Sequence, residues 1–299
     1  MKSLLTFSIA TLLMSTACFA DAPAADAVIS IWPSDPPAWD APTEPEADTS
    51  GEDGRQVAGE RVIRLGNVAT PQLHVYRPVG IDSGTAVVIC PGGGYSILAW
   101  DLEGTEIAER FSKIGVTALV LKYRVPTRQA ETNWLAPVQD VQRSIGLVRS
   151  GAIDGVQASR VGVLGFSAGG NASAHAALAK KRHYDAIDGA EDTKFTPDYA
   201  VLVYPAWLVK DDNPGQLIDT LEVTPQSPPM FFAHASDDRI NAMSSVTMYS
   251  ELKKHQIPGS LHVFASGGHG FGSRVAGAPT DAWFELCHQW MNSQGWLKP

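Results

Sequence analysis

Cysteine is scarce in the sequence, with three residues among 299. Cys18 lies in an N-terminal segment whose removal we expect, which leaves Cys90 at the end of an expected strand and Cys287 in an expected terminal helix. Two such cysteines do not amount to the disulfide framework of a small secreted protein. We therefore expect two buried thiols that pack as small apolar side chains.

Basic residues and long apolar runs are also in short supply. Lys and Arg together number 23 against 32 Asp and Glu, which gives a formal net charge of -9. The sequence has no basic cluster of the kind that binds phosphate backbones, which argues against a nucleic-acid partner and fits a neutral or sugar-like ligand more easily. Such acidity is also common for solubility alone. No run of about 18 apolar residues follows the N-terminal segment, so we expect no integral membrane segment in the mature chain.

The first twenty residues have the pattern of a signal peptide. Lys2 supplies the positive charge, residues 4–14 supply the apolar stretch, and small residues suited to cleavage follow at Ala17, Cys18 and Ala20. We expect removal of residues 1–20 and a secreted or periplasmic protein. The alternative is a lipoprotein attached through Cys18, although Ser15 stands where a leucine is usual.

A Pro-rich and acidic stretch at residues 21–55 follows, and its prolines block regular structure. We interpret it as a linker or a loosely draped arm, in which Trp32 and Trp39 either dock on the domain or stay exposed. The folded domain is expected at residues 56–299. It begins with strands at 61–65 and 72–76, which we expect to pair antiparallel as a lead-in.

Beyond this pair, strands and helices alternate. Continuous apolar runs predict strands buried on both faces at 85–90, 117–121, 161–166, 199–204 and 230–233, and a further strand follows at 260–264. Apolar residues three or four positions apart predict helices at 102–114, 136–150, 169–180, 242–255 and 280–292. The alternation predicts an α/β fold with a mostly parallel sheet and helices on both faces. Residues 206–229 fit this rhythm poorly, and we expect a small cap there.

The strongest chemical motif is Gly165-Phe166-Ser167-Ala168-Gly169, which stands between an expected buried strand and an expected helix. In a nucleophile elbow the serine occupies a strained turn that exposes its hydroxyl, and the two glycines let neighbouring backbone pass without a Cβ clash. The alternative is a structural glycine-rich turn. The position between strand and helix predicts that Ser167 is a catalytic nucleophile.

A serine nucleophile needs a base and a carboxylate that orients the base, and on a sheet of this kind the order is serine, acid, histidine. His269 lies in a glycine-rich loop after the last expected strand, whereas the other histidines lie in or near expected strands and helices. We predict that His269 is the base. Asp237 and Asp238 both follow the preceding strand, and their adjacency leaves the choice of acid open.

Three consecutive glycines, Gly92, Gly93 and Gly94, follow the first buried strand. Such a turn frees backbone N–H groups to point at a developing oxyanion, and together with the N–H of Ala168 they would form an oxyanion hole. A phosphate-binding loop is the alternative, but no Gly-Lys-Ser or Gly-Lys-Thr follows and no dinucleotide-type glycine pattern is present.

In this order the motifs resemble the esterase and lipase branch of the α/β-hydrolase superfamily, close to bacterial acetylxylan-esterase-like and feruloyl-esterase-like proteins. The resemblance covers roughly residues 60–295, and its matching segments are 90–95, 121–124, 165–170, 234–238 and 267–271. It implies an α/β-hydrolase fold and hydrolysis of carboxylic esters by a serine triad, with no cofactor and no metal ion.

The resemblance also implies roles for individual residues. Gly93, Gly94 and Ala168 would supply the oxyanion hole, and Asp238 would be the acid, because relatives carry it four residues after the histidine that ends the strand. The sequence departs from many relatives at Pro91, where they carry histidine, and at residues 241–242, where Val-Pro is usual.

The sequence therefore predicts a secreted serine esterase for short, acetyl-type esters, with carbohydrate esters as a candidate substrate. Tyr95, Trp100 and Trp207 are expected near the mouth of the site, where they either stack on a sugar ring or pack in the core. Two other classes stay open. One is a serine peptidase of the prolyl-oligopeptidase type, although such enzymes usually carry a large propeller, and the other is a non-catalytic binding protein on a hydrolase fold.

Overall fold

The computed structural model describes residues 24–37 and 39–297, so the expected signal peptide lies outside the described residues. Its centre is an eight-stranded sheet in the order β1-β6-β9-β7-β10-β11-β12-β13. β6 runs antiparallel to both of its neighbours, and the remaining pairs are parallel. The mostly parallel sheet with an antiparallel strand near one edge is confirmed. The strands are β1 (Ala27–Ser30), β6 (Gln72–Tyr76), β7 (Thr85–Cys90), β9 (Val116–Lys122), β10 (Arg160–Phe166), β11 (Tyr199–Val203), β12 (Met230–Ala235) and β13 (Gly259–Phe264).

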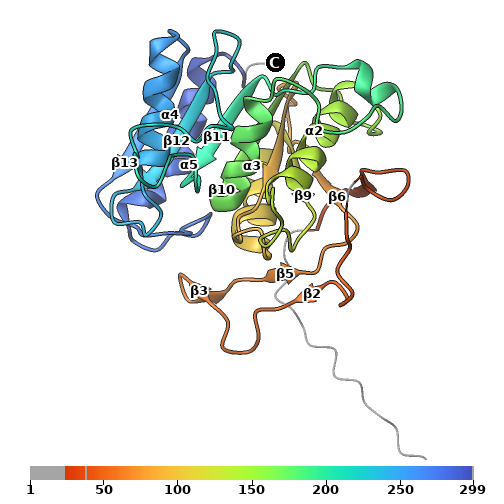
Figure 1. The fold of residues 1–299 in the computed structure, drawn as a ribbon, viewed down its shortest axis with the longest axis horizontal. Helices are drawn as coiled ribbons and strands as arrows, with labels where there is room; N and C mark the ends of the chain where they lie inside the picture. Colours follow the sequence, from red (N-terminus) through yellow and green to blue (C-terminus); the bar gives the residue numbers. More distant parts are fainter. Residues whose placement is uncertain (1–23, 38, 298–299) are drawn as a thin grey trace, which may run out of the picture.

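The central strands are mostly apolar because helices cover both faces of the sheet (Figure 1). All residues of β7, β9, β11 and β12 are buried. Alternate side chains enter two separate cores: Val88 packs with helices α2, α3 and α4, and Val87 packs with α1 and α5. The helices are α1 (Glu106–Lys113), α2 (Leu135–Arg149), α3 (Ser167–Ala177), α4 (Met243–Lys254) and α5 (Trp283–Ser293).

The five predicted helices all occur, but two of them begin irregularly. The first starts with a π-helical turn, η1 (Asp101–Thr105), before α1, and the last is preceded by a 3₁₀ turn, η3 (Pro279–Ala282). A further 3₁₀ turn, η2 (Gly189–Asp192), follows α3. A π-helical turn inside a helix is rare and often lies at a functional site.

The N-terminal edge of the sheet differs from the prediction. The outer neighbour of β6 is β1, which comes from the segment interpreted as a linker or arm, and not residues 61–65. A four-residue strand beside prolines gives little sequence signal, and an edge strand tolerates nearby prolines. The arm also docks through Trp32, which is 6% exposed and donates from Nε1 to Asp140 Oδ1 at 2.8 Å.

Residues 47–66, together with Leu98–Ala99, form two small sheets apart from the central one. Figure 1 shows them as a separate layer at one end of the central sheet. Their strands are short, and each pairing joins two residues of one strand to two of the other. β3 (Gln56–Val57) pairs with β4 (Glu60–Arg61), and β5 (Arg64–Gly66) pairs with both β2 (Ala47–Asp48) and β8 (Leu98–Ala99). Several contacts tie this layer to the domain, among them the bond from Ile63 N to Asp101 Oδ1 at 2.9 Å and the bond from Arg274 to Glu60 O at 2.8 Å.

The expected cap at residues 206–229 packs against the core. Within it a single isolated bridge joins Val209 to Leu217. Leu208, Leu221 and Val223 are buried in the same core as α2, α3 and α4. Cys90 and Cys287 are buried and free, as expected. In the part of the chain that the structure describes, no helix has the length and apolarity needed to cross a membrane.

Candidate active site

The predicted nucleophile, base and acid meet at the carboxyl-terminal edge of the sheet. Ser167 directly follows β10, Asp238 follows β12 and His269 follows β13. Parallel strands bring their carboxyl ends to one edge, where α/β proteins carry their ligand sites. His269 Nε2 lies 2.8 Å from Ser167 Oγ, and His269 Nδ1 lies 2.8 Å from Asp238 Oδ2. The structure therefore brings all three side chains into one hydrogen-bonded series.

Ser167 occupies a strained turn between β10 and α3. Its φ of 51° lies in the left-handed region, which costs a residue with a side chain of order 1 kcal/mol or more. The two neighbouring glycines are required by close backbone contacts. A Cβ at Gly169 would lie 2.1 Å from Cys90 O, and one at Gly165 would lie 2.2 Å from Gly169 O. The motif thus has the sharp geometry that its sequence predicts.

The two adjacent carboxylates make different contacts with the His269 loop. Asp238 binds the ring, and its Oδ1 also accepts from Ile240 N at 2.7 Å. Asp237 instead accepts from the backbone of the loop, from Gly268 N at 2.8 Å. Burial alone would raise the pKa of Asp238, but hydrogen bonds from His234, His269 and the Ile240 amide hold it well below its usual range. Asp238 is therefore an anion beside the imidazole.

The glycine turn after β7 is shaped to present backbone donors. Gly93 has a φ of 141°, and a Cβ there would lie 1.9 Å from Ile97 O. Within the described residues, the N–H groups of Gly93 and Gly94 donate to no protein acceptor. Ala168 lies in the first turn of α3, where N–H groups have no helical partner. The three predicted oxyanion-hole donors are therefore available to a ligand.

A buried carboxylate that sequence reasoning missed holds this turn in place. Glu103, in the π-helical turn η1, accepts from Gly92 N at 2.7 Å and from Tyr204 Oη at 2.9 Å. Tyr204 Oη in turn accepts from Gly272 N, in the His269 loop, at 3.1 Å. Burial raises the pKa of Glu103. In the sequence Glu103 looks like one more polar residue of an amphipathic helix, and no spacing marks it.

Of the three aromatic residues expected near the mouth of the site, one lines the cavity and two pack in the core. The prediction for Tyr95 as a substrate contact is wrong: it is fully buried, and its Oη donates to Asn171 Oδ1 at 2.8 Å. Its φ of 60° belongs to the glycine turn and directs the ring into the core. Trp100 packs against His74, with ring centroids 4.7 Å apart, and also faces the core. Trp207 lines the cavity, with the Arg128 guanidinium 4.5 Å from its ring centroid.

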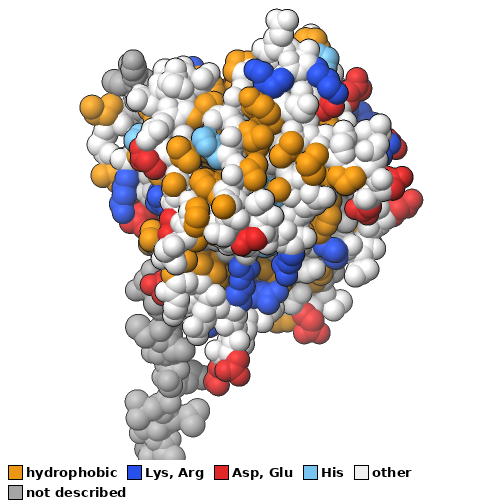
Figure 2. Space-filling model, turned by 90° about the vertical axis from the view of Figure 1, so that its left-hand side faces the viewer, with side chains coloured by type: hydrophobic (Ala, Val, Ile, Leu, Met, Phe, Trp, Pro, Cys, Tyr) orange, Lys and Arg blue, Asp and Glu red, His pale blue; other side chains and the backbone are white. Residues whose placement is uncertain are grey.

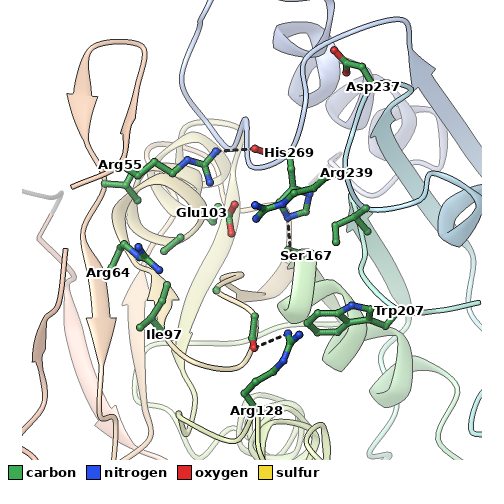
Figure 3. Close-up of a pocket in the computed structure, with 15 residues that line it drawn as sticks. Arg55, Arg64, Ile97, Glu103, Arg128, Ser167, Trp207, Asp237, Arg239 and His269 are labelled. Atoms are coloured by element: carbon green, nitrogen blue, oxygen red, sulfur yellow. Dashed lines mark hydrogen bonds between the residues drawn. The ribbon is translucent and has the colours of Figure 1, made fainter. Parts of the chain in front are cut away.

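The cavity above Ser167 has a volume of about 760 Å³ and a mixed lining (Figure 3). The small N-terminal sheets supply one wall, through Arg55, Val62 and Arg64. Arg128 and Arg239 line it from the loops after β9 and β12. The sequence predicted none of these arginines, because residues so far apart in the chain give no local signal of a shared cavity. Across residues 24–37 and 39–297, no group of three or more His, Cys, Asp or Glu is placed to hold a metal ion.

Comparison with known proteins gives one family match and two relatives by sequence. The family model that matches, over residues 87–227, is described as alpha/beta hydrolase fold. An acetylxylan esterase of Xylanibacter ruminicola is 28% identical over 268 residues, which is 81% of this chain and 51% of the relative. Endo-1,4-beta-xylanase B of Butyrivibrio fibrisolvens is 24% identical over 226 residues, which is 67% of this chain and 34% of the relative. The chain thus spans about half or less of the length of these relatives.

One solved structure is similar to this chain over a larger share of its length. The acetyl ester-xyloside bifunctional hydrolase of Caldicellulosiruptor lactoaceticus is 26% identical, with a TM-score of 0.68. The similarity covers 91% of this chain and 98% of that one. These comparisons confirm the resemblance that the motifs predict.

Proposed function

Because the chain has the α/β hydrolase fold, we propose that it is a serine esterase that hydrolyses short, acetyl-type esters of carbohydrates. The hydrogen-bonded series from Asp238 through His269 to Ser167 carries the proposal. The similarity to an acetylxylan esterase supports the acetyl group and the sugar. The peptidase and the non-catalytic binding protein gain no support from the site or from the relatives.

In the first step Ser167 Oγ attacks the ester carbonyl, and His269 Nε2 takes the serine proton. The negative charge that forms on the carbonyl oxygen meets the N–H groups of Gly93, Gly94 and Ala168. Asp238 holds the imidazole in the required tautomer and stabilises its protonated form. When the tetrahedral intermediate collapses, the C–O bond to the alcohol breaks and His269 returns the proton to the departing oxygen.

In the second step water replaces the alcohol. His269 Nε2 removes a proton from the water as its oxygen attacks the acyl-Ser167 carbonyl. The same backbone donors stabilise the second oxyanion. Collapse breaks the bond between the acyl carbon and Ser167 Oγ, and the imidazole returns its proton to the serine. The products are the free carboxylic acid and the alcohol, and the enzyme is restored.

The activity is tested directly by incubating the purified protein with p-nitrophenyl acetate and with acetylated xylo-oligosaccharides. We expect p-nitrophenol from the first substrate and acetate from the second. A p-nitroanilide dipeptide serves as the peptidase substrate, and we expect no release from it. Cleavage of the anilide without cleavage of either ester would contradict the proposal.

We expect short acyl chains to react faster than long ones. The aliphatic lining of the cavity is limited to Val62, Ile97, Ala99 and Ile240, and charged side chains interrupt it. A long acyl chain would remove water from these charges without giving them partners, which costs a kilocalorie or more. We expect kcat/KM for p-nitrophenyl acetate to exceed that for the C12 ester by at least about tenfold. A faster C12 ester would contradict this.

We also propose that the enzyme is exported and loses residues 1–20. The proposal rests on the charged, apolar and small-residue regions in the first twenty positions. Mass spectrometry of the protein from its native host is expected to show a chain that begins near Asp21. A mature chain that begins at Met1 would contradict it.

A further inference from the structure

Four arginines line the cavity that holds Ser167, namely Arg55, Arg64, Arg128 and Arg239. Within the described residues, none of the four forms an ion pair with a carboxylate. Other arginines of the chain do, as in the fully buried pair of Arg124 with Asp140. Figure 2 shows one group of Lys and Arg side chains low in the centre of the face that it draws, with other basic side chains elsewhere on that face. A chain with a net charge of -9 thus concentrates positive charge at its candidate active site.

The two carboxylates of the lining are already engaged. Glu103 is buried and accepts from Gly92 N and Tyr204 Oη. Asp237 accepts from the backbone of the His269 loop. Among the described residues neither forms an ion pair with a lining arginine, although the Arg55 charge acts against burial to lower the pKa of Glu103. The arginines therefore repel one another across the cavity, and an anion bound between them would offset that repulsion.

Two of the arginines are held in place, and two have uncommitted donors. Arg55 donates to His269 O at 2.7 Å and to Gly270 O at 3.0 Å. Arg128 lies over Trp207 and near Gly94 O. The guanidinium groups of Arg64 and Arg239 donate to no group among the described residues. In Figure 3 Arg64 lies on the side of the N-terminal strands and Arg239 lies beside His269, so they approach the cavity from different sides.

We propose that the ester substrate carries a carboxylate on its alcohol part, and that Arg64 and Arg239 bind it. This inference rests on the proposed function and narrows its substrate to the ester of an acidic sugar, such as an acetylated uronic acid. The planar guanidinium presents paired N–H donors that match the two oxygens of a carboxylate. Binding at the mouth leaves the acyl group free to reach Ser167. The electric field of Arg55 and Arg128 attracts the carboxylate toward the cavity.

The test compares two acetyl esters of similar size and shape, one charged and one neutral. These are 4-acetoxybenzoate, which carries a carboxylate, and 4-acetoxybenzamide, which is neutral, and each rate is divided by the rate of hydrolysis in hydroxide. We expect the enzyme to favour the charged ester by about tenfold in kcat/KM at low salt. The preference should shrink at 1 M salt, where the screening length falls to about 3 Å. Acetylated methyl glucuronoside against acetylated methyl glucoside should show the same order.

The variants Arg64→Gln and Arg239→Gln assign the preference to residues. Each is expected to lower the ratio of charged to neutral kcat/KM by about threefold, within the range for an exposed ion pair. The double variant Arg64→Gln/Arg239→Gln is expected to lose most of the preference. The matched control is Arg77→Gln, which follows β6 at the opposite edge of the sheet and donates to Asp154 O. We expect the control to keep the wild-type ratio.

Three results would overturn the proposal. Equal rates on the two esters in the wild-type enzyme would show that no carboxylate is recognised, while esterase activity itself would stand. A preference that survives in the double variant would remove the assignment to Arg64 and Arg239. A preference for an acetylated sugar phosphate over the glucuronoside would identify phosphate as the recognised group. Failure of the proposed function is distinct from these, because then neither ester would be hydrolysed.

Discussion

Substituting Ser167→Ala is expected to lower kcat for p-nitrophenyl acetate by about 10⁶, the scale on which serine hydrolases lose activity with their nucleophile. The change removes the only atom that the mechanism bonds to the acyl group. What remains is attack by water beside the oxyanion donors, which still exceeds the uncatalysed reaction by roughly 10³. The measurement is the rate of p-nitrophenol release at saturating substrate.

The fold should survive this substitution. Alanine keeps the Cβ and meets the same φ of 51°, and among the described residues the lost Oγ is hydrogen-bonded to His269 alone. We expect the midpoint of thermal unfolding to change little. The control is Ser96→Ala, an exposed serine in the loop next to the glycine turn, which should keep full activity. A Ser167→Ala enzyme that keeps more than a few per cent of kcat would refute the proposed nucleophile.

Asp238→Asn is expected to lower kcat by about 10⁴, as it does in a serine protease of another fold. The asparagine amide would donate toward His269 Nδ1, which forces the imidazole proton onto Nε2. In that tautomer Nε2 cannot accept the proton of Ser167. The geometry of the site would be kept, so the loss should fall on kcat and not on KM.

Asp237→Asn is the matched control for that substitution. Its oxygen can still accept from Gly268 N, so the His269 loop should keep its position. We expect a loss of less than about tenfold, because one backbone hydrogen bond changes from a charged to a neutral acceptor. Circular dichroism of both variants checks the fold. If Asp237→Asn were inactive while Asp238→Asn stayed active, the assignment of the acid would be reversed.

Local patterns predicted the central part of this molecule well. The buried strands were found because runs such as 85–90 and 230–233 are apolar on both faces, and the turn at Ser167 was found because strand, motif and helix are consecutive. The adjacency of Asp237 and Asp238 left the acid open on sequence alone. The structure separates the two by direction: one side chain meets the imidazole ring and the other meets the loop backbone.

Features made by distant segments were not predictable in this way. β1 was missed because four residues beside prolines carry too little pattern, and Tyr95 was misplaced because its left-handed backbone reverses the direction that an ordinary turn would give it. Glu103 acquires its role only when Gly92 and Tyr204 pack against it. The arginine lining of the cavity was not predictable for the same reason, because residues 55–64 and residue 239 come together only in the folded chain.

The small N-terminal sheets have a consequence for how such an enzyme can diverge. Arg55, Val62 and Arg64 precede β6, whereas Ser167, Asp238 and His269 follow β10, β12 and β13. Part of the cavity wall is therefore encoded before the stretch that carries the three residues of the hydrogen-bonded series, and another part, which includes Arg239, is encoded within that stretch. Loops of this kind tolerate changes in length and sequence. A recombination that exchanged the coding region for residues 47–66 would replace this part of the cavity wall and leave Ser167, Asp238 and His269 unchanged in the sequence.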